Sequence, residues 1–162
     1  MLRFLKIAVP VFIIGFVAGA AFWYLASPLF IDRVVNEELP SGFSLTEART
    51  GDFRDADGAH RGSGKARVLD LETGGALLRF TEFDVTNGPD LEVWLVQEPD
   101  PKASADVIAS KWMSLGPLKG NKGDQTYVIP DGTNIAEWGS VVIWCEQFGV
   151  LFSVATFSPA ET

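Results

Sequence analysis

An uncharged segment of 25 residues, residues 7–31, constrains the fold of this chain more than any other feature. A helix that crosses a ~30 Å hydrocarbon layer needs about 20 apolar residues. Pro10 and Gly15 are tolerated in a membrane helix, and Trp23 and Tyr24 lie where aromatic rings favour the interface. The sequence therefore predicts a transmembrane helix that places residues 7–31 in a membrane.

Two alternatives exist for this segment, an uncleaved signal anchor and a cleaved signal peptide. A signal peptide has a shorter apolar region and a cleavage site of small residues. Ala18-Gly19-Ala20 fits such a site, but the bulky residues Phe22-Trp23-Tyr24 follow it, which favours the anchor. Arg3 and Lys6 precede the segment, so the positive-inside rule predicts a cytoplasmic N-terminus and an extracytoplasmic remainder, periplasmic or on the cell surface.

The remainder of the chain is acidic. All 21 acidic residues follow residue 31, together with 11 of the 13 basic residues. A domain with this balance repels nucleic acid, so we exclude nucleic acid as a partner. The chain has one cysteine and therefore no internal disulfide, and a domain of about 110 residues can be stabilised by its core alone.

Short apolar segments alternate with Gly-, Pro- and Asn-containing turns, which is typical of an all-β fold. We expect a signal anchor at residues 1–31, a linker at 32–47 and a single antiparallel β-sandwich domain at 48–158. Residues 51–58 are predicted as a loop because of their Gly and Asp content, and residues 103–108 as a short helical turn. Strands are expected at residues 67–72, 76–83, 91–96, 112–115, 126–129, 140–145 and 150–157.

Cys145 is the only side chain with ready thiol redox chemistry, and it lies at the end of the strand predicted over residues 140–145. Strand alternation places Val141, Ile143 and Cys145 on one face, and Val142 and Trp144 on the other. A free cysteine usually packs as a small hydrophobic residue. Outside the cytoplasm, however, an unpaired thiol is prone to oxidation unless it is buried or used. A packed thiol and a working thiol are both compatible with the sequence.

His60, the only histidine, lies in a Gly-rich segment, where a solvated or capping role is the ordinary interpretation. A thiolate and an imidazole are nevertheless ligands for copper or haem iron, so Cys145 and His60 are candidate cofactor ligands. The sequence has no hydrolase or zinc-protease motif, and one Cys with one His falls short of a zinc site. We therefore do not expect an enzyme of a familiar class.

Two turn-rich segments are candidate binding loops. The segment at residues 119–125 carries the clearest local positive charge of the acidic domain, which suits docking of an acidic partner. Its ordinary interpretation is a soluble turn. The residues proposed for binding are Asn87, Gly88, Pro89, Lys119, Asn121, Lys122 and Asp124.

Several blocks together resemble the DM-thirteen domain, also called the electron-transfer DM domain, found in Skeletor-type proteins and in bacterial membrane-anchored proteins. The matching blocks are Gly51-Asp52-Phe53 and residues 60–64, 77–83, 86–95, 115–127 and 140–146. The resemblance implies a β-sandwich whose signature cysteine, matched by Cys145, acts in redox chemistry as a thiol or through a bound group such as haem. The family's histidine before Gly-x-Gly is matched by His60.

Three functions follow from these observations. The first is a membrane-tethered extracytoplasmic redox module that exchanges electrons with a redox protein partner through Cys145. The second is a non-catalytic cell-surface binding module in which Cys145 is a core residue. The third, a metal-assisted enzyme, needs carboxylate ligands that the sequence does not identify.

Overall fold

The computed structural model describes residues 2–27, 30–39, 41–42 and 44–160, in two units, Met1–Ile31 and Asp32–Thr162. The first unit is helix α1 (Leu2–Ala26), with Pro10 inside it. Its segment Lys6–Tyr24 has a mean hydropathy of 2.1 and is long and apolar enough to cross a membrane. A helix is therefore present where the uncharged segment predicts one.

The second unit is the antiparallel β-sandwich that the sequence predicts. Sheet A contains β1, β2, β3, β6 and β9, and sheet B contains β5, β4, β7, β8 and the last part of β1. The strands are hydrogen-bonded in the order β5-β4-β7-β8-β1-β2-β3-β6. The two end strands, β5 and β6, also contact each other, so the sandwich is nearly a closed barrel. The elements are β1 (Leu45–Asp55), β2 (Gly62–Leu71), β3 (Ala76–Val85), β4 (Leu91–Val96), α2 (Ser104–Ala109), β5 (Trp112–Pro117), β6 (Gln125–Ile129), a 3-10 turn (Ile135–Glu137), β7 (Ser140–Cys145), β8 (Val150–Thr156) and β9 (Ser158–Pro159).

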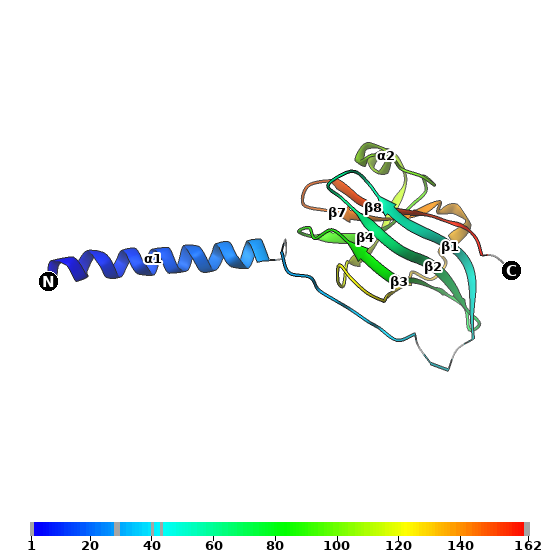
Figure 1. Ribbon diagram of the computed structural model, residues 1–162. Helices are drawn as coiled ribbons and strands as arrows, with labels where there is room; N and C mark the ends of the chain where they lie inside the picture. Colours follow the sequence, from blue (N-terminus) through cyan, green and yellow to red (C-terminus); the bar gives the residue numbers. More distant parts are fainter. Residues whose placement is uncertain (1, 28–29, 40, 43, 161–162) are drawn as a thin grey trace. The chain divides into compact units, whose positions relative to one another are not determined.

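Strand β1 joins the two sheets. Its first part pairs with β2 and β9, and its last residues, Phe53–Asp55, pair with β8 (Figure 1). The prediction of a loop from residue 51 is therefore wrong as far as Asp55, and the turn covers only residues 56–60. Gly51 explains the difference, because a Cβ there would collide with the Thr156 carbonyl oxygen. Glycine at this position permits a close approach of two backbones instead of a turn.

The faces of β7 separate two apolar clusters, as its alternation predicts. Val141, Ile143 and Cys145 face the core between the sheets. Val142 and Trp144 face outward, where they pack with Val107 of α2 in a second, smaller cluster. The helical turn expected at residues 103–108 is α2, which covers the outer face of sheet B and so buries both faces of β7.

Candidate functional site

Cys145 ends β7 and is completely buried. Its register neighbours are Leu91 of β4 and Val150 of β8. The thiol donates a hydrogen bond to the Pro89 carbonyl oxygen, with Sγ and O 3.0 Å apart. Pro89 belongs to the loop at residues 86–90, which we call the cover loop. The thiol is thus packed and hydrogen-bonded, and reagents reach it only if the cover loop or its surroundings open.

His60 lies in the turn between β1 and β2, and Asp57 organises that turn. One Asp57 oxygen accepts hydrogen bonds from the Ala59 and His60 amides at 2.8 Å, and the other lies 2.8 Å from His60 Nδ1. Such side-chain to backbone contacts are typical of Asp in turns. The hydrogen bond with the His60 side chain, followed by those with the two amides, lowers the pKa of the Asp57 carboxyl to about 2.

Phe152 connects His60 with the surroundings of Cys145. Its ring centroid lies 4.3 Å from that of His60, and its side chain belongs to the same core cluster as Cys145. Gly88 of the cover loop lies directly on this ring, since a Cβ at Gly88 would be 2.6 Å from Phe152 Cε1. The structure therefore brings His60, the cover loop and Cys145 to one end of the sandwich. Among the described residues, no hydrogen bond joins His60 to Cys145 directly.

The turn that carries His60 is also attached to the cover loop through its backbone. The Arg61 amide donates to Thr86 Oγ1 at 2.8 Å, and the Thr86 amide donates to the Arg61 carbonyl oxygen at 2.9 Å. The Gly-x-Gly that follows His60 serves packing: a Cβ at Gly62 would collide with the Ser153 side chain, and Gly64 has a φ of 105° at a bulge of β2. A movement of the cover loop therefore involves the His60 turn.

The donor atoms near Cys145 do not fit a metal site. His60 Nδ1 is engaged by Asp57, which leaves Nε2 as its one possible ligand atom. The Cys145 thiol is engaged by a backbone carbonyl. Within the described part of the chain, no group of three or more His, Cys, Asp or Glu side chains is placed to hold a metal ion. A copper site needs further ligands beside one thiolate and one imidazole, and an axial haem ligand needs an open approach, whereas Cys145 is completely buried and its thiol is hydrogen-bonded to Pro89. The residues present therefore fit a thiol site better than a cofactor site.

The predicted binding residues lie on two connected segments. Asn87 Nδ2 and Asn121 Nδ2 both donate to Asp32 Oδ1, at 3.0 and 2.8 Å. Lys119 Nζ lies 2.7 Å from Glu37 Oε1, and Lys122 Nζ lies 2.6 Å from Asp32 Oδ2. Both basic side chains are thus paired with acidic residues of the segment that the sequence assigned to the linker.

Three tryptophans on the outer face of sheet B form a stack. Trp94 lies between Trp112 and Trp144, with ring centroids 4.0 and 5.1 Å away and interplanar angles of 10° and 27°. The Trp94 indole N–H donates to Glu92 Oε2 at 2.7 Å, and Trp112 remains 46% exposed. The sequence alone predicts neither this stack nor the contacts of Phe152. Strand spacing puts Trp94 and Trp144 on outward faces, but only the β4–β7 register makes them neighbours.

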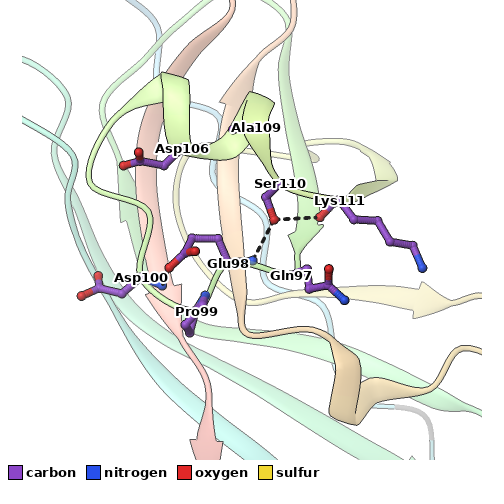
Figure 2. Close-up of a pocket in the computed structure, with 8 residues that line it drawn as sticks. All are labelled: Gln97, Glu98, Pro99, Asp100, Asp106, Ala109, Ser110 and Lys111. Atoms are coloured by element: carbon purple, nitrogen blue, oxygen red, sulfur yellow. Dashed lines mark hydrogen bonds between the residues drawn. The ribbon is translucent and has the colours of Figure 1, made fainter.

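A polar pocket of about 580 Å³ lies beside α2. Figure 2 shows its lining residues, with Asp100 and Asp106 on one side and Lys111 on the other. Its carboxylates have structural partners. Asp106 Oδ2 accepts from the Lys102 and Ala103 amides at the start of α2, and Asp100 pairs with Arg54 at 2.7 Å. Hydrogen bonds from Lys102 and Arg54 lower the pKa of Asp100. These contacts hold the connection between β4 and α2 in place, so the carboxylates beside the pocket have a structural role.

A family model described as Electron transfer DM13 matches residues 52–157, which run from the last part of β1 to the residue before β9. The matched segment contains His60, the cover loop, residues 119–126 and Cys145. No curated protein and no solved structure matches the chain.

The Asp57–His60 contact gives a testable pH dependence. Because the pKa of Asp57 is lowered in the folded state from 3.8 to about 2, its contribution to the turn is fully present above about pH 4 and is lost as the pH falls through 2. We expect the Asp57 carboxyl carbon to titrate near pH 2 by NMR. In His60→Ala the midpoint should move toward 3.8, but not all the way, because the two amide donors remain. An unchanged midpoint would contradict the assigned cause.

Proposed function

Because the chain belongs to the electron transfer DM13 family, we propose that it is a membrane-tethered redox module that works outside the cytoplasm, with Cys145 as its redox group. The observation that carries the proposal is the position of the only thiol, under the cover loop and at the end of the sandwich that also carries His60. The apolar helix Lys6–Tyr24 supports the tether. Arg3 and Lys6 support a cytoplasmic N-terminus.

In the proposed step, the cover loop opens and the Cys145 sulfur attacks one sulfur of a disulfide on a partner protein. A mixed disulfide forms, the partner's S–S bond breaks, and the leaving sulfur takes up the proton that the Cys145 thiol gives up. One thiol of a donor dithiol then attacks the Cys145 sulfur of the mixed disulfide; that S–S bond breaks, and the partner's second sulfur leaves and takes up the proton of the attacking thiol. The second donor thiol attacks the resulting Cys145–donor disulfide, and Cys145 leaves as a thiol with the proton that this second thiol gives up. Over the cycle the donor dithiol is oxidised to a disulfide and the partner's disulfide is reduced to two thiols.

One observation favours a second function, a binding module without redox chemistry. Cys145 is completely buried and its thiol is satisfied by the Pro89 carbonyl oxygen, which is the environment of a core cysteine. The two functions differ in the rate at which the thiol becomes accessible. A working thiol reacts through local opening of the cover loop, whereas a core thiol reacts only when the domain unfolds.

Reaction of the full chain with glutathione disulfide, followed by mass, distinguishes the two functions. For the redox module we expect one glutathione on Cys145 under native conditions, at a rate well above that of global unfolding, and full reversal by a thiol. Cys145→Ser should bind none and should lose electron exchange with the partner, while its unfolding stays cooperative. Modification that proceeds only at the global unfolding rate would assign Cys145 to the core and leave the binding module.

A further inference from the structure

Residues 32–37 lie along residues 119–126, the block that carries most of the positive charge of the predicted binding loops. Three backbone hydrogen bonds join them: the Val35 amide donates to the Lys122 carbonyl oxygen at 2.9 Å, the Glu37 amide to that of Asp124 at 2.9 Å, and the Lys122 amide to that of Arg33 at 3.3 Å. Val34 and Lys122 form a parallel bridge. This pattern is that of an extended peptide added beside a strand-like edge.

Glycines make room for the added segment. A Cβ at Gly120 would collide with the carbonyl oxygen of Arg33. The next nearest atoms would be Val35 Cγ2 and the carbonyl carbon of Arg33. A Cβ at Gly123 would likewise collide with the Val35 carbonyl oxygen. At Gly120 all three of the nearest atoms thus belong to residues 32–37. Its missing side chain therefore serves this contact, whatever else the loop requires.

Side chains recognise the two ends of the segment. At one end, Asp32 accepts hydrogen bonds from Asn87, Asn121 and Lys122. Those from Lys122 and Asn121 lower its pKa. At the other end, Glu37 accepts from Lys119 Nζ at 2.7 Å and from the Thr126 amide at 2.8 Å. Buried Asn121 also accepts from the Arg33 amide, which fixes the register.

We infer that residues 119–126 form a docking groove for an extended segment with an acidic residue at each end, and that residues 32–37 of this chain occupy it as a releasable strap. The strap leads to α1, which ends at Ala26. While it is docked, only residues 27–31 lie between α1 and the groove; once it is released, the connection extends as far as β1 at Leu45. An extended chain spans at most about 3.3–3.6 Å per residue. Release of the strap therefore raises the maximum length of the connection between α1 and the folded domain roughly threefold to fourfold.

Docking of the strap thus controls which partners the domain can reach. This inference rests on contacts of residues 32–37 and does not depend on redox activity of Cys145. If the Cys145 thiol does not react, this inference is unaffected. If the strap is not docked, the redox proposal is unaffected.

Limited proteolysis of the full chain in detergent micelles tests the inference. Trypsin cleaves after Arg33, and we expect cleavage to require release of the strap, because the docked backbone of Arg33 is hydrogen-bonded to Asn121 and Lys122, although Arg33 and Val34 are exposed. We expect Gly120→Ala to accelerate release of the fragment that begins at Val34 by roughly tenfold or more, and to accelerate amide exchange at Val35 and Glu37. Gly58→Ala is the matched control, because a Cβ at Gly58 would have no atom within 4 Å.

Gly120→Ala could also destabilise the whole domain, which faster hydrogen exchange at the buried Ile143 amide would reveal. A second pair of variants therefore tests the strap without changing a glycine. Glu37→Gln removes the charge that Lys119 holds, whereas Glu38→Gln changes an exposed neighbour. Faster cleavage and exchange in Glu37→Gln but not in Glu38→Gln would support the strap. Wild-type rates in both Gly120→Ala and Glu37→Gln would overturn it.

Discussion

Replacing Phe152 by alanine should lower the free energy of unfolding by about 3–5 kcal/mol and expose the Cys145 thiol to reagents. Phe152 is 6% exposed, lies in the core between the sheets and contacts both His60 and the position of Gly88. Its removal leaves a cavity beneath the cover loop, which loses the surface on which Gly88 rests. Chemical denaturation measures the first effect, and the rate of thiol labelling measures the second.

Phe148→Ala is the matched control, because it removes the same side chain from the β7–β8 turn, where Phe148 is 65% exposed. We expect this variant to change the unfolding free energy by about 0.5 kcal/mol or less and to leave thiol labelling unchanged. Equal labelling rates in Phe152→Ala and the wild type would show that Phe152 does not support the cover loop.

Replacing Asp124 by alanine should cost about 3 kcal/mol of stability, because it leaves a buried charge without its partner. The Arg79 side chain is almost fully buried, and its Nη2 donates to Asp124 Oδ2 at 2.9 Å. The other Asp124 oxygen accepts from the Glu82 amide at 3.0 Å. Thr126 Oγ1 would remain the only side-chain acceptor of Arg79 among the described residues.

Asp131→Ala provides the comparison, since Asp131 is an exposed carboxylate in the turn after β6. Its denaturation midpoint should stay close to that of the wild type. If Asp124→Ala unfolds at the same denaturant concentration as Asp131→Ala, the Arg79–Asp124 pair does not stabilise the domain.

Local patterns were sufficient to predict the class of fold and strands β2 to β8, but not β1 or β9. The hairpin of β2 and β3 follows from Gly74-Gly75, both of which adopt positive φ, and the two faces of β7 follow from alternation. The strand at Gly51 was predicted as a loop, because glycine occurs both in turns and where two backbones approach closely. The sequence pattern alone does not separate these two cases. Only the approach of Thr156, far along the chain, distinguishes the two.

The candidate site residues could be named from the sequence, but the contacts between them could not. Cys145 and His60 stand out as single instances of their residue types, whereas their link through Phe152 requires the β7–β8 register and the packing of the cover loop. Residues 32–37 were expected in a linker because they are polar and mixed in charge. Their acidic ends gain partners only when the groove at residues 119–126 is folded.

The double pairing of β1 has a consequence for how the domain folds. Its first part can pair early, because β2 follows directly, but Phe53–Asp55 must wait for β8, about a hundred residues later. Closing so long a loop is slow, and folds dominated by such pairings reach the native state in milliseconds to seconds. During synthesis, the edge of β1 therefore stays unpaired until β8 has emerged, and over this interval the chain depends on protection from aggregation.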